Sequence, residues 1–263
     1  DVYKRQGVGG GGGNAVNHMY HQGIGGVSFV LCNTDAQALR NSPVPVKVQL
    51  GAKGEGAGNI PEVAKKLAEE SAAEVEALFD DNTRMAFITA GMGGGTGTGA
   101  APVVARIAKE KGVLTVGIVT IPFLFEGEPK ILQAFAGVEE MRKHVDALLV
   151  INNERLCKIY PDLSWTTAFA KADDSLSNAA RSIAELVSKD GKINLDFADV
   201  RTTLKDGGAA VISTGSGEGE HRMSRAIQNA LTSPLLKESD IYGAERVLFN
   251  LYFSPEEGEE LRM

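Results

Sequence analysis

Cysteine is scarce in this chain, and its scarcity excludes two classes of protein. Only Cys32 and Cys157 are present, far apart in the sequence, so the chain shows neither a disulfide framework nor the spacing of a zinc site. Cys32 lies in an apolar run, where we expect a small buried side chain. No segment is apolar for long enough to cross a bilayer, and no signal-peptide layout is visible. Direct membrane insertion is therefore not predicted.

Positive charge is also in short supply. The chain has 27 Lys and Arg residues against 34 Asp and Glu, a net charge of −7. This balance argues against nucleic acid as a partner and is typical of a soluble cytoplasmic protein. Hydrophobic residues make up 43% of 263, so the chain is long and apolar enough for one large or two modest domains with buried cores.

Glycine is abundant, and one glycine-rich segment organises the rest. Residues 93–99 hold five glycines and two threonines between a predicted buried strand, 85–90, and a helix that opens near 100, with Pro102 in its first turn. Without Cβ atoms the backbone can direct several N–H groups at one ligand, and the positive end of the helix acts at the same point. We interpret the segment as a polyphosphate site formed by Gly94, Gly95, Thr96, Gly97 and Thr98. A tight strand-to-helix turn is the simpler alternative.

A second glycine-rich segment, residues 7–14, is followed by a predicted helix at 14–21 and a strand at 27–33. Gly7, Gly9 and Gly12 fit the dinucleotide-binding pattern GxGxxG, and Asp35 follows at about the distance of a ribose-binding acid. An NAD-linked Rossmann oxidoreductase is therefore an alternative. It leaves the richer segment at 93–99 unexplained, whereas a nucleoside triphosphate could use both.

Strands and helices alternate along the first part of the chain, which predicts a parallel sheet with helices on both faces. Ligands of such sheets bind at the carboxyl ends of the strands, where both glycine segments, residues 33–35 and residues 122–127 converge. The segment 51–59 is either a surface loop or a cover for the nucleotide. Further strands are expected at 114–121, 147–151, 209–214 and 247–253, and further helices at 61–79, 131–144, 166–189 and 221–231.

Two segments together resemble the tubulin/FtsZ family of GTPases, over residues 7–263. They are GGGTGTG at 93–99 and NLDFAD at 194–199. The resemblance implies a Rossmann-like GTPase fold that binds GTP or GDP, with Mg²⁺ held through phosphate and water and no protein metal ligands. It assigns phosphate and base contacts to residues of the segment 7–14 and to one residue after the next strand: Gly10, Gly11, Gly12, Gly13, Asn14 and Asn33.

The same resemblance implies roles for the sugar and base contacts. Glu126 matches a ribose-binding residue, and Lys130 stands where the family commonly has Arg, a point charge in place of a bidentate fork. Phe169 would lie against guanine, and Asp174, next to Asp173, would accept from its N–H groups. From the residues alone, solvation is the favoured interpretation of two adjacent acids on a helix.

Asp196 and Asp199 are three residues apart, so a helical turn would put both on one face. An ordinary helix start with a capping Asp explains them without any function. The resemblance implies that they act with Asn194 on the nucleotide of the next subunit in a head-to-tail filament, so that hydrolysis depends on assembly. A filament protein without hydrolysis is a further alternative.

We expect four regions: a GTPase domain at 1–165, a central helix at 166–190, a catalytic loop and helix start at 191–206, and an incomplete α+β domain at 207–263. Residues 1–6 are polar where a buried strand should run, and we expect them to be foreign to the native chain. The family's tail, which contacts other division proteins, is expected to be missing. The resemblance places the protein in the cytoplasm, at the division ring at mid-cell.

Overall fold

The computed structural model describes residues 3–24, 26–160, 162, 164–188, 196–232 and 243–252. Contacts divide the chain into two compact units, Asp1–Ala210 and Val211–Met263, which are described separately below. The last residue of the helix predicted at 166–189, the loop at 191–195 and the last residue of the strand predicted at 247–253 lie outside the described residues.

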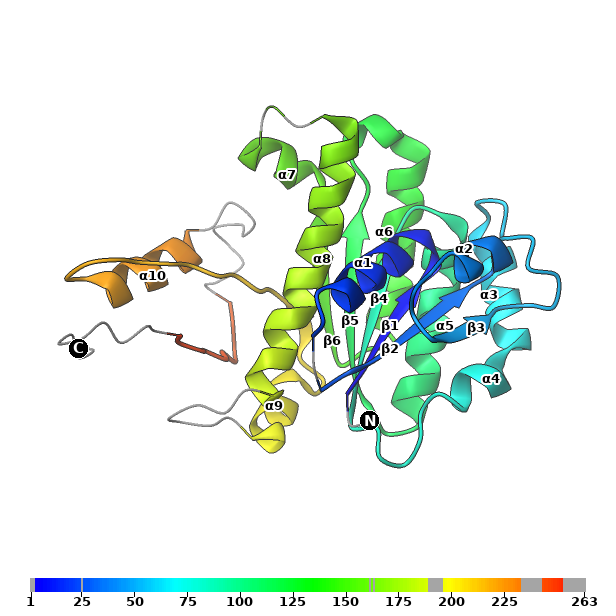
Figure 1. Ribbon diagram of the computed structural model, residues 1–263, viewed down its shortest axis with the longest axis horizontal. Coiled ribbons are helices and arrows are strands. Elements are labelled where there is room, and N and C mark those ends of the chain that lie inside the picture. The colour runs from blue at the N-terminus through cyan, green and yellow to red at the C-terminus, as the bar shows by residue number, and fades with distance from the viewer. Residues whose placement is uncertain are drawn as a thin grey trace. The chain divides into compact units, whose positions relative to one another are not determined.

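The first unit is built on a seven-stranded sheet in the order β3-β2-β1-β4-β5-β6-β7, and every neighbouring pair is parallel (Figure 1). This arrangement confirms the predicted α/β, Rossmann-like fold. The strands are β1 Tyr3–Val8, β2 Ser28–Asn33, β3 Val46–Gln49, β4 Met85–Gly91, β5 Leu114–Ile121, β6 Ala147–Asn152 and β7 Gly208–Ala210.

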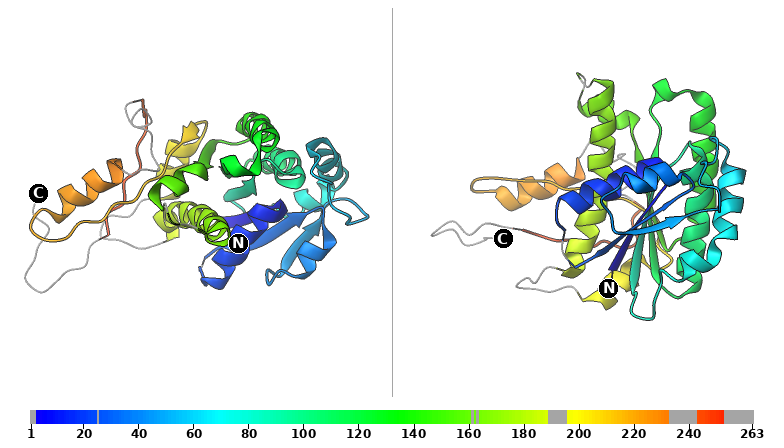
Figure 2. Two further views of the ribbon diagram at one scale, coloured as in Figure 1. Left: turned by 90° about the horizontal axis from the view of Figure 1, so that it is seen from above. Right: turned by 45° about the vertical axis from the view of Figure 1, so that its right-hand side comes forward.

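Helices cover both faces of the sheet (Figure 2). One face carries α1 and α8, which contact each other, and the other carries α3, α5 and α6. The helices of the first unit are α1 Gly9–His21, α2 Ala36–Arg40, α3 Pro61–Glu70, α4 Ala72–Glu76, α5 Gly95–Glu110, α6 Glu128–Arg142, α7 Glu154–Ile159, α8 Trp165–Ser188 and α9 Phe197–Leu204, with a 3₁₀ turn at Leu124–Glu126.

The two helices after the glycine segments begin earlier than predicted. α1 starts at Gly9 and not at 14, and α5 starts at Gly95, which puts Pro102 inside the helix. Their glycines pack against strands: a Cβ added to Gly12 would lie 2.1 Å from the Thr89 carbonyl oxygen, and one on Gly97 would lie 2.2 Å from that of Gly91. The helices therefore approach the sheet more closely than any larger residue allows, and this packing overrides the low helix propensity of glycine.

Three other boundaries differ from the prediction. The expected helix at 61–79 breaks at Ser71, whose hydroxyl accepts a hydrogen bond from the backbone N–H of Gly51 at 2.9 Å. The expected strand at 209–214 is reduced to β7, which pairs with β6 and extends the first sheet. Residues 247–252 form no strand, because the described part of the chain gives them no neighbouring strand to pair with.

β1 occupies the middle of the sheet, between β2 and β4, although it contains three consecutive polar residues. Arg5 and Gln6 are fully buried, and Lys4 nearly so. Arg5 donates to the Met19 sulfur and the Ala180 carbonyl, both at 3.2 Å, whereas both side-chain amide atoms of Gln6 lack a hydrogen-bond partner. A central strand of a parallel sheet is normally apolar, so these side chains are out of place.

α8 crosses the whole unit and has 24 residues. Its buried positions include Ala172, Leu176 and Ile183, which follow the predicted helical spacing. Ser177 ties it to α1 by donating to the Ala15 carbonyl at 3.2 Å. α8 therefore forms a rigid connection between the two ends of the sheet.

In the second unit, α10 Arg222–Leu231 confirms the helix expected at 221–231. The backbone at Gly215 and Gly217 packs directly on it: a Cβ added to Gly215 would lie 2.1 Å from the Ala226 carbonyl oxygen. These glycines therefore serve close packing against α10.

Candidate functional site

The N-termini of α1 and α5 meet at the carboxyl ends of β1 and β4. A Cβ added to Gly9 would lie 2.8 Å from the backbone nitrogen of Gly97, and one on Gly11 would lie 3.2 Å from the Gly91 Cα. Neither helix has a side-chain cap at its N-terminus. Unpaired amide donors and the positive ends of two helices therefore gather at one place, as the sequence predicted.

Two glycines in this arrangement are not explained by packing. A Cβ on Gly10 would meet nothing within 4 Å, and one on Gly94 would meet only Asn59 Oδ1, at 3.8 Å. Gly94 has ordinary extended dihedrals, and Gly10 is not among the residues with positive φ. Since the fold itself would accept a larger residue at both positions, the free space in front of them is available to a ligand.

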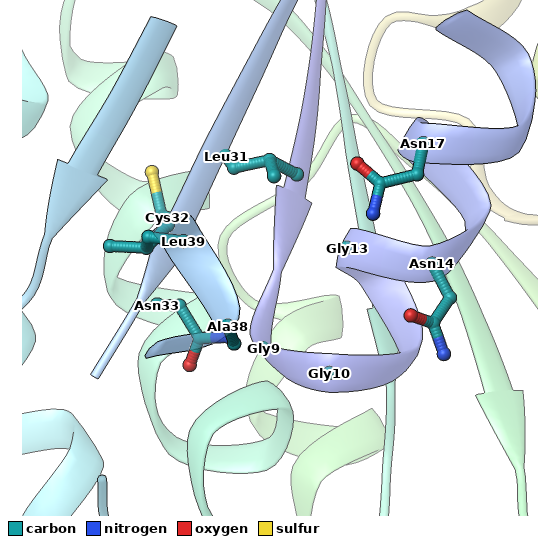
Figure 3. Close-up of a pocket in the computed structure, with 10 residues that line it drawn as sticks. All are labelled: Gly9, Gly10, Gly13, Asn14, Asn17, Leu31, Cys32, Asn33, Ala38 and Leu39. Carbon is teal, nitrogen blue, oxygen red and sulfur yellow. The ribbon is translucent and has the colours of Figure 1, made fainter. Parts of the chain in front are cut away.

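β2 brings a third segment to the same edge. The Thr34 and Thr96 hydroxyls hydrogen-bond at 2.7 Å, and Asn33 is buried with its amide oxygen accepting from the Asp35 N–H at 3.2 Å. A pocket opens here between α1, β2 and α2 (Figure 3). It is lined by Gly9, Gly10, Gly13, Asn14, Asn17, Leu31, Cys32, Asn33, Ala38 and Leu39. Thr34 was not predicted individually, and only its place after a strand pointed to it.

Asp35, the residue that suggested an NAD-linked enzyme, is the N-cap of α2. Its carboxylate accepts from the backbone nitrogens of Gln37 at 2.8 Å and Ala38 at 3.3 Å. The capping role accounts for an acid at this position without a ribose. Thr98 is likewise engaged inside the protein, since its hydroxyl accepts from the Gly93 N–H at 2.9 Å.

Glu126 and Lys130 lie beside the glycine segment at the start of α6. Their charged groups are 3.4 Å apart, and Glu126 also accepts from the Phe123 N–H at 3.0 Å. Gly93 is held against the same helix start, because a Cβ there would lie 2.9 Å from the Lys130 carbonyl oxygen. The structure thus places both predicted sugar-binding residues next to the predicted phosphate site.

Three phenylalanines cluster at the N-terminal end of α8. Phe123 is fully buried and stacks on Phe125 with centroids 4.9 Å apart. Phe169 meets both rings edge-on, at 5.4 Å and 6.0 Å, and stays 42% exposed. A half-exposed ring on a rigid aromatic base is suited to stack against a flat ligand.

The two adjacent acids of α8 have different surroundings. Asp174 forms ion pairs with His18 at 3.1 Å and Lys171 at 3.6 Å. Burial, with the nearby Asp174 charge as a second cause, raises the pKa of Asp173 to about 6. Asp173 therefore lacks the charge partners of its neighbour, and a ligand with N–H groups would stabilise its carboxylate.

Asn153 is a candidate that sequence reasoning missed. It follows β6, its side chain is buried, and its amide oxygen has no hydrogen-bond partner. Its neighbour Leu156 belongs to the same hydrophobic cluster as Phe123 and Ala172. This buried acceptor, at the edge of the sheet where the glycine segments meet, is available to a ligand that carries a donor. The only available signal was its position after a strand.

The predicted acid pair lies at the other end of the sheet. Asp196 caps α9 and accepts from the Asp199 N–H at 2.9 Å, while Asp199 accepts from the Asp196 N–H at 3.2 Å. The next residue, Phe197, lies 6.2 Å from the ring of Tyr3, which begins β1. The glycine segments follow the ends of β1 and β4, so a full strand length, about 20 Å, separates them from the acids (Figure 1).

This geometry confirms the helix-capping interpretation of the two acids. Each carboxylate uses one oxygen in the reciprocal cap, and both side chains are exposed. Their catalytic role stays a prediction. Asn194, the third predicted catalytic residue, lies outside the described residues. In the described ranges no three His, Cys, Asp or Glu side chains form a group that could hold a metal. No described helix has both the length and the apolar character needed to cross a membrane.

Comparison with known proteins decides the family. The model of the tubulin/FtsZ family GTPase domain matches residues 4–161, and that of the FtsZ family C-terminal domain matches residues 208–257. The chain belongs to the tubulin/FtsZ family. This membership confirms the resemblance seen in the sequence, and it favours a GTPase over the NAD-linked alternative.

Individual relatives agree with this tubulin/FtsZ assignment. The chain is 64% identical over 260 residues to the cell division protein FtsZ of Porphyromonas gingivalis, covering 97% of this chain and 57% of that protein. It is 48% identical to FtsZ of Wigglesworthia glossinidia brevipalpis, covering 95% and 66%. A solved FtsZ dimer from M. jannaschii superposes with a TM-score of 0.84 at 43% identity, covering 89% of this chain and 69% of that one. The chain thus spans a little over half of the first of these curated relatives and two thirds of the second.

Proposed function

We propose that this chain binds GTP where the N-termini of α1 and α5 meet, and that it takes part in hydrolysing GTP to GDP and phosphate. The observation that carries the proposal is the contact between two uncapped helix starts, with open space in front of Gly10 and Gly94. Backbone donors from two helices suit a triphosphate better than a single pyrophosphate, because they offer more hydrogen bonds and two positive helix ends.

Guanine is the base that the surroundings of α8 favour. Phe169 offers the stacking surface, and the Asp173 carboxylate suits the paired N–H donors that guanine has and adenine lacks. Asp173 replaces Asp174 as our preferred acceptor, because Asp174 already pairs with His18 and Lys171. The Asn153 amide would meet a further polar atom of the base, and Glu126 with Lys130 would contact the sugar.

Hydrolysis is completed in trans in this proposal. Asp196 and Asp199 are too far from their own glycine segments to act there, but a head-to-tail contact would bring them to the nucleotide of a neighbouring copy. Such heterologous contacts build open filaments. The two carboxylates would polarise and position the attacking water at the γ-phosphate, with help from Asn194, since phosphoryl transfer depends mainly on positioning and charge stabilisation.

Mg²⁺ belongs to this chemistry as a charge-neutralising ion on the phosphates. It would bind through phosphate oxygens and water, as Mg²⁺ commonly does with triphosphates. We further propose that the filaments form the division ring in the cytoplasm at mid-cell. A solved relative of this chain is a dimer, which supports self-association.

Two measurements test the proposal on the chain as it stands. Equilibrium binding of GTP, ATP and NAD should show a preference for GTP, and a preference for NAD would refute it. The GTPase rate per molecule should rise with protein concentration, because assembly completes the site. A constant specific rate would contradict the shared site, and GTP binding with assembly but no hydrolysis would support the hydrolysis-deficient alternative.

A further inference from the structure

Gln133 extends from α6 to the glycine segment that opens α5. Its amide nitrogen Nε2 donates to the carbonyl oxygens of Gly93 at 2.9 Å and Gly94 at 3.2 Å. The same nitrogen lies 3.4 Å from the carbonyl oxygen of Asn59. All three partners are acceptors, so only the NH₂ end of the carboxamide satisfies them, and its orientation is fixed.

These contacts determine where the neighbouring amides point. The described chain has no cis peptide bond, and in a trans peptide the carbonyl oxygen and the following N–H point in opposite directions. Gln133 holds the carbonyls of Gly93 and Gly94 toward α6. The N–H groups of Gly94 and Gly95 must therefore point away from α6, at the very start of α5.

Glycine makes this restraint important. Gly93 has a φ of 101°, and neither glycine has a side chain to oppose rotation of its peptide groups. The Gly93 N–H is held from inside by Thr98, at 2.9 Å. Among the described residues, Gln133 is the side chain that holds the two peptide groups that follow.

We propose that Gln133 is a positioning residue for the phosphates: it aims the amide donors of Gly94 and Gly95 without touching the nucleotide. Through the Asn59 carbonyl it also connects these donors to the segment 51–59, so that Gln133 fixes the position of this segment relative to the phosphate site. The inference rests on the proposed function, because it names part of that site. Its effect is confined to the phosphates, since its hydrogen bonds go to the carbonyls of Gly93, Gly94 and Asn59 and to none of the residues proposed to contact the base or the sugar.

The experiment compares GTP with guanosine, which lacks phosphates. Gln133→Met keeps the length of the side chain and removes both donors, and Gln133→Glu keeps its shape but turns an oxygen toward the carbonyls. Gln228→Met, at an exposed position of α10, is the matched control. We expect GTP affinity to fall about tenfold in Gln133→Met and further in Gln133→Glu, with guanosine affinity unchanged in both.

Each outcome has a distinct meaning. Unchanged GTP affinity in Gln133→Met overturns the inference. An equal loss for GTP and guanosine overturns it too, because Gln133 would then support the whole site and not the phosphate donors. Thermal unfolding checks both variants against the control, and if Gln133→Met is unfolded, Gln133→Glu carries the same comparison. A wild-type chain that binds no GTP refutes the proposed function instead, and this is measured first.

Discussion

Replacing Gln6 with Leu should stabilise the fold, although it removes a polar residue from the middle of a strand. Gln6 is fully buried, and neither its amide nitrogen nor its amide oxygen has a hydrogen-bond partner. An unsatisfied buried polar group costs about 1–3 kcal/mol. Leu has a similar volume and leaves no polar atom, so we expect the free energy of unfolding to rise by about 2–4 kcal/mol.

The assay is urea unfolding, with thermal unfolding in parallel. At about 2–4 °C per kcal/mol for a chain of this size, the thermal midpoint should rise by roughly 4–16 °C. Gln37→Leu, at an exposed position on α2, is the control and should change stability by no more than about 0.5 kcal/mol. An unchanged or lower midpoint for Gln6→Leu would refute the idea that β1 holds uncompensated polar groups.

Because the neighbouring Arg5 is also buried, we expect the stability of the fold to depend on pH. Burial, the largest cause, lowers the pKa of Arg5 to about 10, well below the usual value of a guanidinium group. Because the folded state binds this proton less tightly than the unfolded state, the buried charge destabilises the fold below about pH 10, and this cost declines as the pH rises above that value. The contacts to Met19 and Ala180 offset part of it.

Two further predictions concern the proposed phosphate site and the proposed base contact. Gly10→Ala should fold normally but bind GTP at least tenfold more weakly, whereas Gly12→Ala should lose about 3 kcal/mol of stability, because its Cβ would lie 2.1 Å from the Thr89 carbonyl oxygen. Circular dichroism with nucleotide titration separates the two effects, and equal behaviour of the two variants would count against a ligand at Gly10. With the pKa of Asp173 at about 6, GTP affinity should fall about tenfold per pH unit below pH 6, and Asp173→Asn should abolish this dependence. A pH profile that the substitution leaves unchanged would exclude Asp173 as the acceptor.

The buried strands of the sheet were the easiest part to predict. β5 matches its predicted range at Leu114–Ile121, and β2, β4 and β6 agree to within one residue, because parallel strands covered on both faces appear as apolar runs. The convergence of the glycine segments followed from topology alone, since the carboxyl ends of parallel strands share one edge.

What sequence reasoning missed depends on tertiary contacts. The start of α1 at Gly9 follows from its close approach to Thr89, which no local pattern reveals. The different surroundings of Asp173 and Asp174 depend on whether His18, on another helix, reaches them. Asn153 became a candidate only when its buried oxygen proved to lack a donor. Helix starts, charge partners and orphan groups are set by neighbours distant in sequence.

The central claim, a nucleotide site completed by a second copy, is tested most directly by mixing two variants, each impaired in a different half of the site, at a GTP concentration that Gly10→Ala binds poorly. Gly10→Ala has an impaired phosphate site, and Asp199→Ala lacks one of the paired acids. In an equimolar mixture, roughly a quarter of head-to-tail contacts would join the intact phosphate site of an Asp199→Ala copy to the intact acid pair of a Gly10→Ala copy. GTPase activity should therefore recover in part on mixing, whereas no recovery in a mixture that still assembles would contradict the account.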